Sequence, residues 1–585
     1  MRLMTSKSEH STSLYVIKSV YENGKRSTKI VEKLGTVADL DKKLNGKDPY
    51  EWAREYIAER NRIEKEEKGK DPDILIKFSP RKQIPKGEQR SFNGGYLFLQ
   101  RIYHALGLDR ITAKIASRHN FTYDLNAILS RLIYSRILYP ASKRATHQIS
   151  QRFLEQADVE LQHIYRSLGV IAEESDFIQA ELYKQSVLGL AKRNTGVLYY
   201  DCTNYFFEVE QEDGLKQYGY SKEHRPNPIV QMGLFMDGDG IPLAFSITEG
   251  NKNEQLTLKP LEKQILADFG VSKFVVCTDA GLSSLVNRKF NDMGNRSFIT
   301  TQSVKKLEGY LNGWALHAEG WRLPGEKKVY DIGGLYREKE DIAYLDREQY
   351  FNAVFYKERW INKDGLNQRL VVTFSLKYRN YQRKIRAGQI SRAERAIRAG
   401  VAKLKKANQN DYKRFIRKKN VTVDGEEAKK TLLSMDENQI AKEEIYDGYY
   451  AICTNLEDDV EEIVAVNKRR WEIEESFRIM KHEFKARPAY LQRDDRIKAH
   501  FATCFLSLVV FRYLEKLLGK KYTCCAIIDT LKRMDFLNAK GEGYIPTYTR
   551  TDLTDDLHMV FGFRTDYELV SNRQMKEVFK ASKKK

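Results

Sequence analysis

Two aspartates, Asp201 and Asp279, each end an apolar run that is typical of a buried strand. Since adjacent strands that end at one edge of a sheet bring their last residues together, the two carboxylates are expected to share a crevice of low dielectric constant. Such carboxylates repel each other and are costly to remove from water, and a divalent cation relieves both effects. Mg²⁺ prefers a few carboxylate oxygens together with the phosphate oxygens of a substrate. Taken singly, each Asp could instead mark a turn, where Asp is common.

A third carboxylate, Glu474, lies in a segment that is expected to form a helix over residues 458–484. Arg470, Arg478 and Lys481 are spaced so that they fall with Glu474 along one face. An apolar side that can pack on a sheet is formed by Trp471, Ile473, Phe477, Ile479 and Met480. A carboxylate between cations suits a site that receives a phosphodiester. The alternative is a solvated helix with ordinary ion pairs between successive turns.

The string Arg470-x3-Glu474-x6-Lys481 resembles the signature of bacterial insertion-sequence transposases of the DDE superfamily. In that signature Tyr, Arg, Glu and Lys recur with two, three and six residues between them. The segments LYYDCTNYFFE and VCTDAG are similar to the family's two Asp strands, and the likeness covers residues 196–515. The Tyr position is Asn467 here, which can donate a hydrogen bond to a phosphate but cannot stack on a base or sugar.

The resemblance implies an α/β RNase H-like catalytic core, a mixed five-stranded sheet with helices, which is interrupted by a large insertion and preceded by a mostly helical N-terminal region. It also implies two Mg²⁺ ions, with Mn²⁺ as a substitute, whose ligands and catalytic residues are Asp201, Asp279 and Glu474. The residues expected to contact DNA in this segment are Asn467, Arg470, Arg478 and Lys481. Glu472 lies on a different face of the same helix, so its replacement by Gln is expected to be close to neutral.

The function that follows is cut-and-paste transposition. The protein would bind the terminal repeats of an insertion sequence on double-stranded DNA, as a homodimer, and would cleave strands and join them to target DNA. One alternative is an inactive relative retained for DNA binding, which the presence of all three carboxylates disfavours. The other is a structure-specific nuclease on the same fold, which the family likeness alone distinguishes from a transposase.

The pattern of apolar residues and turns divides the chain into six segments. In order, they are a β-hairpin with a charged helix (1–75), a helical DNA-binding domain (85–192), the first part of the catalytic domain (193–304), a basic insertion domain (305–440), the second part of the catalytic domain with the Glu-bearing helix (441–520), and a basic C-terminal region (521–585).

Basic residues are concentrated in the insertion. Residues 377–419 hold 16 Lys and Arg but only two acids, Glu394 and Asp411, and account for most of the formal net charge of +20. One sign of charge at such density repels itself, and a polyanion would relieve that repulsion. The run is therefore expected to contact the DNA backbone without reading bases, with Lys403, Lys405 and Lys406 among the contacts. A solvated face of an inserted helix is the alternative.

The composition of the whole chain also favours an anionic partner such as DNA. An excess of 100 Lys and Arg over 80 Asp and Glu suits an anionic partner, either nucleic acid or a membrane surface. The most apolar stretch, Phe501–Phe511, is about half the length that crosses a bilayer, and the N-terminus lacks the apolar centre of a secretion signal. None of the six cysteines forms a C-x-x-C pair. We therefore expect a cytoplasmic protein without membrane, zinc or disulfides.

The basic run generates the first prediction. Replacing Lys403, Lys405 and Lys406 together with Ala should weaken binding to DNA of any sequence. Each lost phosphate contact should reduce the slope of log K against log salt by about one. Titrations of a labelled duplex at several salt concentrations measure that slope, and an unchanged slope would identify the run as a solvated face.

Overall fold

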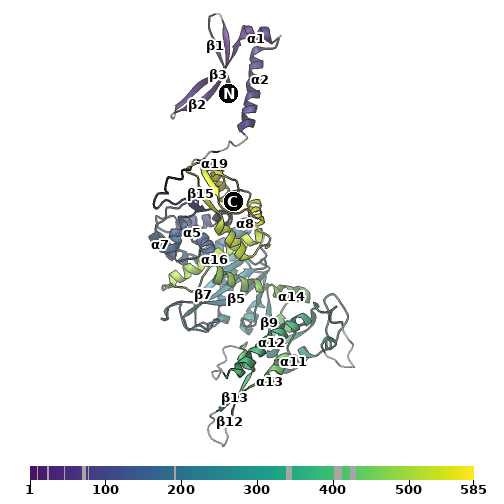
Figure 1. Cartoon of the computed structure of the whole chain (residues 1–585). Coiled ribbons are helices and arrows are strands. Elements are labelled where there is room, and N and C mark those ends of the chain that lie inside the picture. The colour runs from purple at the N-terminus through teal and green to yellow at the C-terminus, as the bar shows by residue number, and fades with distance from the viewer. Residues whose placement is uncertain are drawn as a thin grey trace. The chain divides into compact units, whose positions relative to one another are not determined.

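The computed structural model describes residues 1–584 except 10, 23–24, 45, 69–73, 75, 77, 190–192, 337–345, 401–410 and 422–429. The chain divides into two compact units, Met1–Pro85 and Lys86–Lys585. Figure 1 shows the elements of both units. Lys403, Lys405 and Lys406 lie outside the described residues.

The first unit is a three-stranded antiparallel sheet followed by two helices. Its elements are β1 (Arg2–Lys7), β2 (Thr12–Glu22), β3 (Lys25–Thr36), α1 (Val37–Lys43) and α2 (Pro49–Lys68). Thr36 ends the sheet and begins α1, because its side chain accepts a hydrogen bond from the backbone N–H of Asp39. Leu14, Leu40 and Ala53 form the buried core of this unit.

The second unit is built on an eight-stranded mixed sheet with the order β10-β11-β14-β9-β8-β5-β6-β7. In chain order its strands are β5 (Val197–Phe206), β6 (Ile229–Asp237), β7 (Pro242–Glu249), β8 (Phe274–Thr278), β9 (Arg296–Gln302), β10 (Phe355–Lys363), β11 (Leu366–Phe374) and β14 (Tyr449–Thr454). The strands β8 and β9 run parallel to β5, whereas every other neighbouring pair is antiparallel.

This sheet confirms the α/β class but corrects the number of strands. Five strands were expected, and β5 to β9 are contiguous in the sheet. The strand β14 then pairs with the free edge of β9, and the hairpin β10–β11 from the inserted segment pairs with β14. All residues of β11 except Asn367 are buried, so the inserted hairpin extends the core instead of standing apart from it.

Short helices connect the first strands. They are η1 (Glu254–Leu256), α9 (Leu258–Gln264), the π-helical turn η2 (Ile265–Phe269) and α10 (Leu285–Asn291). The helix expected over residues 458–484 is three consecutive pieces, namely α14 (Val460–Lys468), α15 (Trp471–Arg478) and the π-helical turn η6 (Ile479–Glu483).

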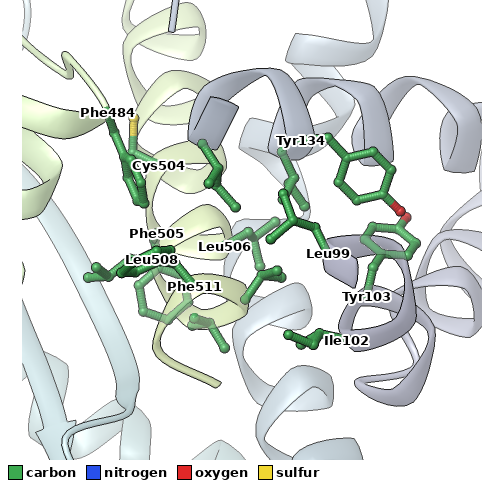
Figure 2. Packing of buried hydrophobic residues seen from close by; sticks show 14 of the residues in the cluster. Leu99, Ile102, Tyr103, Tyr134, Phe484, Cys504, Phe505, Leu506, Leu508 and Phe511 are labelled. Carbon is green, nitrogen blue, oxygen red and sulfur yellow. The ribbon is translucent and has the colours of Figure 1, made fainter. Parts of the chain in front are cut away.

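A long helix, α16 (Asp494–Leu517), is the centre of the helical part of this unit, and every residue from Ala499 to Glu515 is buried. It packs against several helices of the segment that precedes the sheet. That segment holds α3 (Tyr96–Ala105), α4 (Leu108–Ala116), α5 (Leu125–Leu138), α6 (Lys143–Ser150), α7 (Leu161–Glu173) and α8 (Ser175–Gly189), of which α3, α5, α7 and α8 contact α16. Figure 2 shows Phe505, Leu506 and Leu508 of α16 in this core together with side chains of α3 and α5.

By length and composition α16 could cross a membrane, which differs from the expectation based on Phe501–Phe511 alone. Its most apolar window is 94% buried inside the protein, as in the core helix of a globular domain.

The C-terminal segment closes onto the beginning of this unit. Its elements are α17 (Cys524–Arg533), β15 (Asp535–Asn538), β16 (Gly543–Pro546), α18 (Asp552–Phe561), β17 (Val570–Ser571) and α19 (Asn572–Ser582). The strand β15 pairs with β4 (Ser91–Asn93) in a four-stranded sheet. The buried side chain of Asn93 donates a hydrogen bond to the Leu531 carbonyl at 2.9 Å, which holds the two ends of the unit together.

The segment inserted between β9 and β14 holds the hairpin β10–β11 and a mixture of helices and strands. These are η3 (Val304–Lys306), α11 (Gly309–Leu316), η4 (Ile332–Leu335), α12 (Leu376–Arg398), η5 (Tyr412–Phe415), β12 (Ile416–Val421), β13 (Lys430–Met435) and α13 (Glu437–Glu444). The basic helix α12 begins two residues after β11 ends. A buried ion pair between Arg386 and Asp447 fixes α12 to the loop before β14.

Candidate active site

Asp201 and Asp279 are brought together by the register of two parallel strands. The last pair of β5 and β8 is Tyr200 with Thr278, and the two aspartates are the next residue on each strand. Asp279 therefore follows the end of β8, as expected. Asp201 does not end its strand, because β5 continues to Phe206 by pairing with β6.

Each aspartate is oriented by a backbone N–H. An Oδ1 oxygen of Asp201 accepts a hydrogen bond from the Cys202 N–H at 2.7 Å. The Oδ1 of Asp279 accepts one from the Leu282 N–H at 3.0 Å, across the turn that follows β8. Asp201 is only half-buried, so part of its carboxylate remains accessible to a ligand.

Opposing electrostatic effects act on the pKa of Asp201. Burial raises the pKa of its carboxyl to about 6, the Lys222 ammonium opposes this shift, and the charge of Asp279 adds to it. The ionised form of Asp201 therefore needs positive charge close by, which is the electrostatic condition of a cation-binding carboxylate.

Glu474 joins this group through Arg470. The Arg470 Nη1 lies 3.1 Å from the Glu474 Oε1, one helical turn away. Burial alone would lower the pKa of Arg470, but the charges of Glu474, Asp279 and Asp201 raise it above its ordinary value. Arg470 is thus within electrostatic reach of all three predicted carboxylates, and it is paired with one of them, Glu474.

The carboxylates supply the donors that a hard divalent cation takes, so the residues fit such a group chemically. One group of acidic and histidine side chains among the described residues places its ligand atoms within 4.8 Å of one another, and it is Asp555, His558 and Asp566. The three predicted carboxylates do not approach as closely, since Glu474 is paired with Arg470. The Glu474 side chain is 59% exposed and would have to turn toward the aspartates to share an ion with them.

The group at Asp555, His558 and Asp566 is explained by ion pairs. Arg564 contacts the carboxylates of Asp555 and Asp566 at 3.1 Å and 2.6 Å. Arg550 contacts the same two carboxylates at 2.8 Å and 3.4 Å. Two guanidinium groups already neutralise these acids, so we read the group as a structural network of the C-terminal segment.

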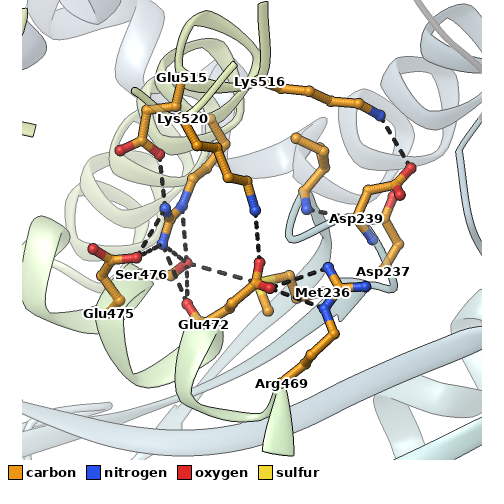
Figure 3. A network of polar contacts seen from close by, with 12 residues as sticks. Met236, Asp237, Asp239, Arg469, Glu472, Glu475, Ser476, Glu515, Lys516 and Lys520 are labelled. Atoms are coloured by element: carbon orange, nitrogen blue, oxygen red, sulfur yellow. Dashed lines mark hydrogen bonds and ion pairs between the residues drawn. The ribbon is translucent and has the colours of Figure 1, made fainter. Parts of the chain in front are cut away.

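Arg512 of the central helix α16 forms hydrogen bonds that hold α15 in place. The Arg512 guanidinium donates to the Ser476 Oγ at 2.9 Å and to the Glu472 carbonyl at 3.2 Å. It also lies 3.3 Å from a Glu475 carboxylate oxygen and 2.7 Å from one of Glu515. Figure 3 shows Glu472, Glu475 and Ser476 of α15 in this network, together with Glu515 of α16. Because its members come from α15 and the buried α16, the network fixes the position and rotation of α15 relative to α16.

Glu472 belongs to the same network and is not a free surface residue. Its side chain is 8% exposed and contacts Arg469 at 3.0 Å and Lys520 at 3.1 Å (Figure 3). A Cβ added at Gly240, where φ is +85°, would lie 2.3 Å from the Glu472 Oε2. The turn between β6 and β7 therefore packs directly against this carboxylate. Gln at position 472 is still expected to be nearly neutral in strand cleavage and strand transfer. The burial of Glu472 was not expected, because sequence spacing gives the face of a helix but not what covers it.

Lys481 faces the same strand as the aspartates. Its Nζ donates a hydrogen bond to the Thr203 Oγ1 at 2.6 Å, two residues beyond Asp201 on β5. Burial lowers the pKa of Lys481 to about 8, and the neighbouring Lys222 ammonium adds to that effect. The π-helical turn η6 carries Lys481 to this position, so Arg470 and Lys481 converge on one site.

The two other predicted DNA contacts have protein partners instead. Arg478 pairs with Glu475 at 3.4 Å. Asn467 is buried, and its Nδ2 donates a hydrogen bond to the Tyr450 hydroxyl at 2.9 Å. In this structure Asn467 ties α14 to β14, and it also lines the groove beside Arg470 and Glu474.

Two residues near Asp201 were not anticipated from the sequence, namely Lys222 and Glu254. The Lys222 Nζ donates a hydrogen bond to the Cys202 carbonyl and lies 3.2 Å from the Glu254 Oε1. Burial alone would lower the pKa of Lys222, but the charges of Glu254 and Asp201 raise it. The spacing of Lys222 and Glu254 in the chain shows no periodicity that would predict a site. Residues 208–228, which contain Lys222, have only the composition of a loop.

A groove of about 960 Å³ adjoins the site on the side of the insertion. Its lining includes Arg470 and Glu474, together with basic and aromatic side chains from three elements, among them Lys377, Tyr378, Tyr381, Lys468 and Trp471. Trp471 and Tyr381 are 57% and 60% exposed. Exposed aromatic rings beside cations form a surface that suits nucleic acid.

The network around α15 generates a prediction. Glu472→Gln should lower the free energy of unfolding by about 1–2 kcal/mol, because Arg469 and Lys520 lose their ionic partner while a polar group stays buried. Glu461→Gln, at an exposed position of α14, should stay within about 0.5 kcal/mol of the parent protein. Urea unfolding of the three proteins measures both, and equal stability of all three would show that the Glu472 contacts contribute nothing.

Comparison with known proteins gives the following picture. Residues 372–510 match the model of the family described as the transposase DDE domain. The matched segment contains Glu474 but neither Asp201 nor Asp279. Among solved structures, a cryo-EM structure of the piggyBac transposase synaptic complex with hairpin DNA is similar at 8% identity and a TM-score of 0.34, covering 84% of this chain and 91% of that chain. A search of curated proteins gave no match. Over residues 372–510, which include the helix with Glu474, the chain is thus similar to transposase DDE domains.

Proposed function

We propose that the chain is a DDE transposase that binds the ends of a bacterial insertion sequence and catalyses DNA strand cleavage and strand transfer. The observation that carries the proposal is the group of Asp201, Asp279 and Glu474 around Arg470, in a chain whose Glu-bearing segment matches the transposase DDE domain.

The topology of the sheet supports an RNase H-like catalytic core. Three antiparallel strands, β7-β6-β5, are followed by the parallel strands β8 and β9. The first Asp lies on the central strand β5 and the second follows its parallel neighbour β8. The Glu-bearing helix comes after a long segment inserted between β9 and β14. This order fits a core split by an insertion, as the resemblance implies.

Divalent metal ions complete the proposal, and we assign two Mg²⁺ ions, with Mn²⁺ as a substitute. Asp201 would contact both, while Asp279 and Glu474 would each complete one coordination shell. When bound, the ions supply Lewis acidity to the attacking and leaving oxygens of an in-line phosphoryl transfer.

The residues of the chain itself position the DNA strand. Arg470 pairs with Glu474 on α15 and offers a guanidinium to a phosphate. Lys481 reaches the same strand edge from η6 and offers a second cation. Because α15 is fixed to α16 through Arg512, both cations are held in place before the substrate arrives. Water, and then a DNA 3′-hydroxyl, would act as the nucleophile.

Double-stranded DNA, as the terminal repeats and as target, is the proposed partner. The net charge of +20 and the basic helix α12 favour a polyanion. We further propose a homodimer in the DNA complex, since an element has two ends and each needs a catalytic site. A cytoplasmic protein that associates with the nucleoid fits this role, and its six free cysteines suit a reducing compartment.

The carboxylates give the central prediction. Asp201→Asn, Asp279→Asn and Glu474→Gln should each reduce cleavage by more than about 100-fold, because even the outer partners of metal ligands commonly cost 10- to 100-fold. Binding of the ends should change little, since the swaps keep shape and remove only a negative charge.

The assay uses Mg²⁺ and DNA that carries the ends of the element encoding the chain. Asp268→Asn and Glu461→Gln, both at exposed positions, are the matched controls and should cleave at the parent rate. Cleavage near the parent level in any of the three site variants would contradict the assignment. Cleavage without joining in the parent protein would favour the nuclease alternative.

Arg470 and Lys481 give a separate prediction. Arg470→Ala and Lys481→Ala should lower the rates of cleavage and strand transfer by about 10- to 100-fold at saturating protein, since small misplacements of a reacting group are costly in rate. Overall affinity should fall less, because many other cations hold the DNA. Single-turnover rates and binding curves separate the two effects, and two silent variants would refute the role of this helix face.

A further inference from the structure

We propose that Lys222 is a further phosphate-binding residue of this site, which acts with Lys481 on the DNA backbone next to the reacting bond. Glu254 and Asn204 are its positioning residues. The inference rests on the proposed function, because it takes DNA as the substrate. It concerns a loop that lies outside the segment similar to transposase DDE domains.

The loop that carries Lys222 is clamped to the strand that carries Asp201. Asn204, three residues beyond Asp201 on β5, is 2% exposed. Its Nδ2 donates a hydrogen bond to the Tyr220 carbonyl at 3.1 Å, and its Oδ1 accepts one from the Lys222 N–H at 3.4 Å. One buried amide therefore binds the backbone on both sides of Ser221 and sets the position from which the Lys222 side chain departs.

A close contact between backbones holds the base of the same loop. A Cβ added at Gly219 would lie 2.0 Å from the Gly250 carbonyl oxygen, so no side chain fits there. Gln217 exchanges backbone hydrogen bonds with Ile229 at the start of β6. The loop is therefore fixed against β5, β6 and the end of β7, and Lys222 is presented from a defined framework.

The Lys222 side chain ends beside Asp201. Its Nζ donates to the carbonyl of Cys202, the next residue, and lies 3.2 Å from the Glu254 Oε1. An ammonium group has three N–H donors, and these contacts use two of them. The side chain is 37% exposed, so the remaining donor can reach a ligand from solvent.

Lys481 is distant from Lys222 in the sequence but contacts the same strand, β5. Lys222 is bonded at Cys202 and Lys481 at Thr203, so two ammonium groups stand over consecutive residues of β5. Lys222 lies 3.2 Å from Glu254 and Lys481 lies 3.7 Å from Glu223, and the charge of Asp201 acts on both lysines. The Lys222 charge contributes to the lowered pKa of Lys481, so the two ammonium groups repel each other, and a phosphate that accepts from both would relieve the repulsion.

The positions of Lys222 and Lys481 indicate where the proposed DNA phosphate would bind. Both cations follow Asp201 along β5, while Arg470 pairs with Glu474 on the helix side and has its pKa raised by the charges of both aspartates. A strand whose reacting phosphate lies at Asp201 would carry a neighbouring phosphate along β5 toward Lys222 and Lys481. The alternative is that Lys222 only balances the charges of Asp201 and Glu254, without touching DNA.

A chemical test separates these readings. Duplexes with the ends of the element carry one methylphosphonate, which is uncharged, at each phosphate near the cut in turn. Full-length parent protein, Lys222→Ala, Lys222→Arg and Glu254→Gln are compared in single-turnover cleavage with Mg²⁺. Lys252→Ala is the matched control, because Lys252 lies in the turn next to Glu254 and pairs with Glu249 at the surface.

We expect Lys222→Ala to slow cleavage by about 10- to 100-fold and Lys222→Arg to restore most of the rate. One methylphosphonate should slow the parent protein by a similar factor and should add less than about threefold in Lys222→Ala, since the contact is already lost. Glu254→Gln should show a smaller loss at the same phosphate. Lys252→Ala should behave as the parent protein at every position.

Two outcomes would overturn the proposal. Methylphosphonate effects that multiply fully with Lys222→Ala at every phosphate would show that Lys222 only balances charge. A Glu254→Gln loss as large as that of Asp201→Asn would make Glu254 a metal ligand instead of a positioning residue.

A binding assay keeps this test distinct from that of the proposed function. If the parent protein cleaves no DNA, or if Asp201→Asn still cleaves, the proposed function fails. The salt dependence of duplex binding then tests Lys222 alone, because loss of one phosphate contact reduces the slope of log K against log salt by about one. An unchanged slope in Lys222→Ala overturns the proposal, and thermal unfolding of the variant verifies that it is folded.

Discussion

The charge conflict between Asp201 and Asp279 is the constraint to which the rest of the site responds. The register of β5 and β8 leaves these carboxylates no freedom to separate, since each is the residue after the last paired position. Burial and the charge of Asp279 raise the pKa of Asp201, so the ionised form of Asp201 is favoured only when cations approach. Arg470 from a helix, Lys222 from a loop and Lys481 from a π-helical turn all do so. These three elements are distant in the sequence, yet each places a cation near the acidic pair. The site therefore contains both carboxylates and cations.

The geometry of that site depends on the helical core as much as on the sheet. Arg512 bonds α15 from α16, which is buried along its length and packs against α3, α5 and α7. The C-terminal segment in turn closes onto the first strand of the unit through Asn93. A disturbance of packing far from the carboxylates would therefore alter the position of Glu474, because the same helix serves as core element and as support.

The sequence was sufficient for residues whose signal is local. Apolar runs with an Asp and a helix with a spaced Arg, Glu and Lys predict a site of Asp201, Asp279, Glu474, Arg470 and Lys481, although β5 continues past Asp201. It was insufficient where tertiary contacts decide. The burial of Glu472 depends on a turn at Gly240, and that of Asn467 on Tyr450 of β14. Lys222 has no periodic pattern around it, and its place follows from the Asn204 clamp. The eight-stranded sheet was missed because pairing of an inserted hairpin with β14 leaves no mark in either strand alone.

That pairing has a consequence for how the insertion can work. The hairpin β10–β11 is hydrogen-bonded to β14, β14 to β9, and β9 to β8, whose end carries Asp279. The insertion is therefore continuous with the catalytic sheet and cannot move as an independent module without breaking a buried ladder. The basic helix α12 leaves the end of β11 beside the groove lined by Tyr378, Trp471 and Arg470. Its cations are consequently held in register with the acidic site. Lys377 of α12 and Arg470 therefore line one groove on a framework that is continuous with the strands of Asp201 and Asp279.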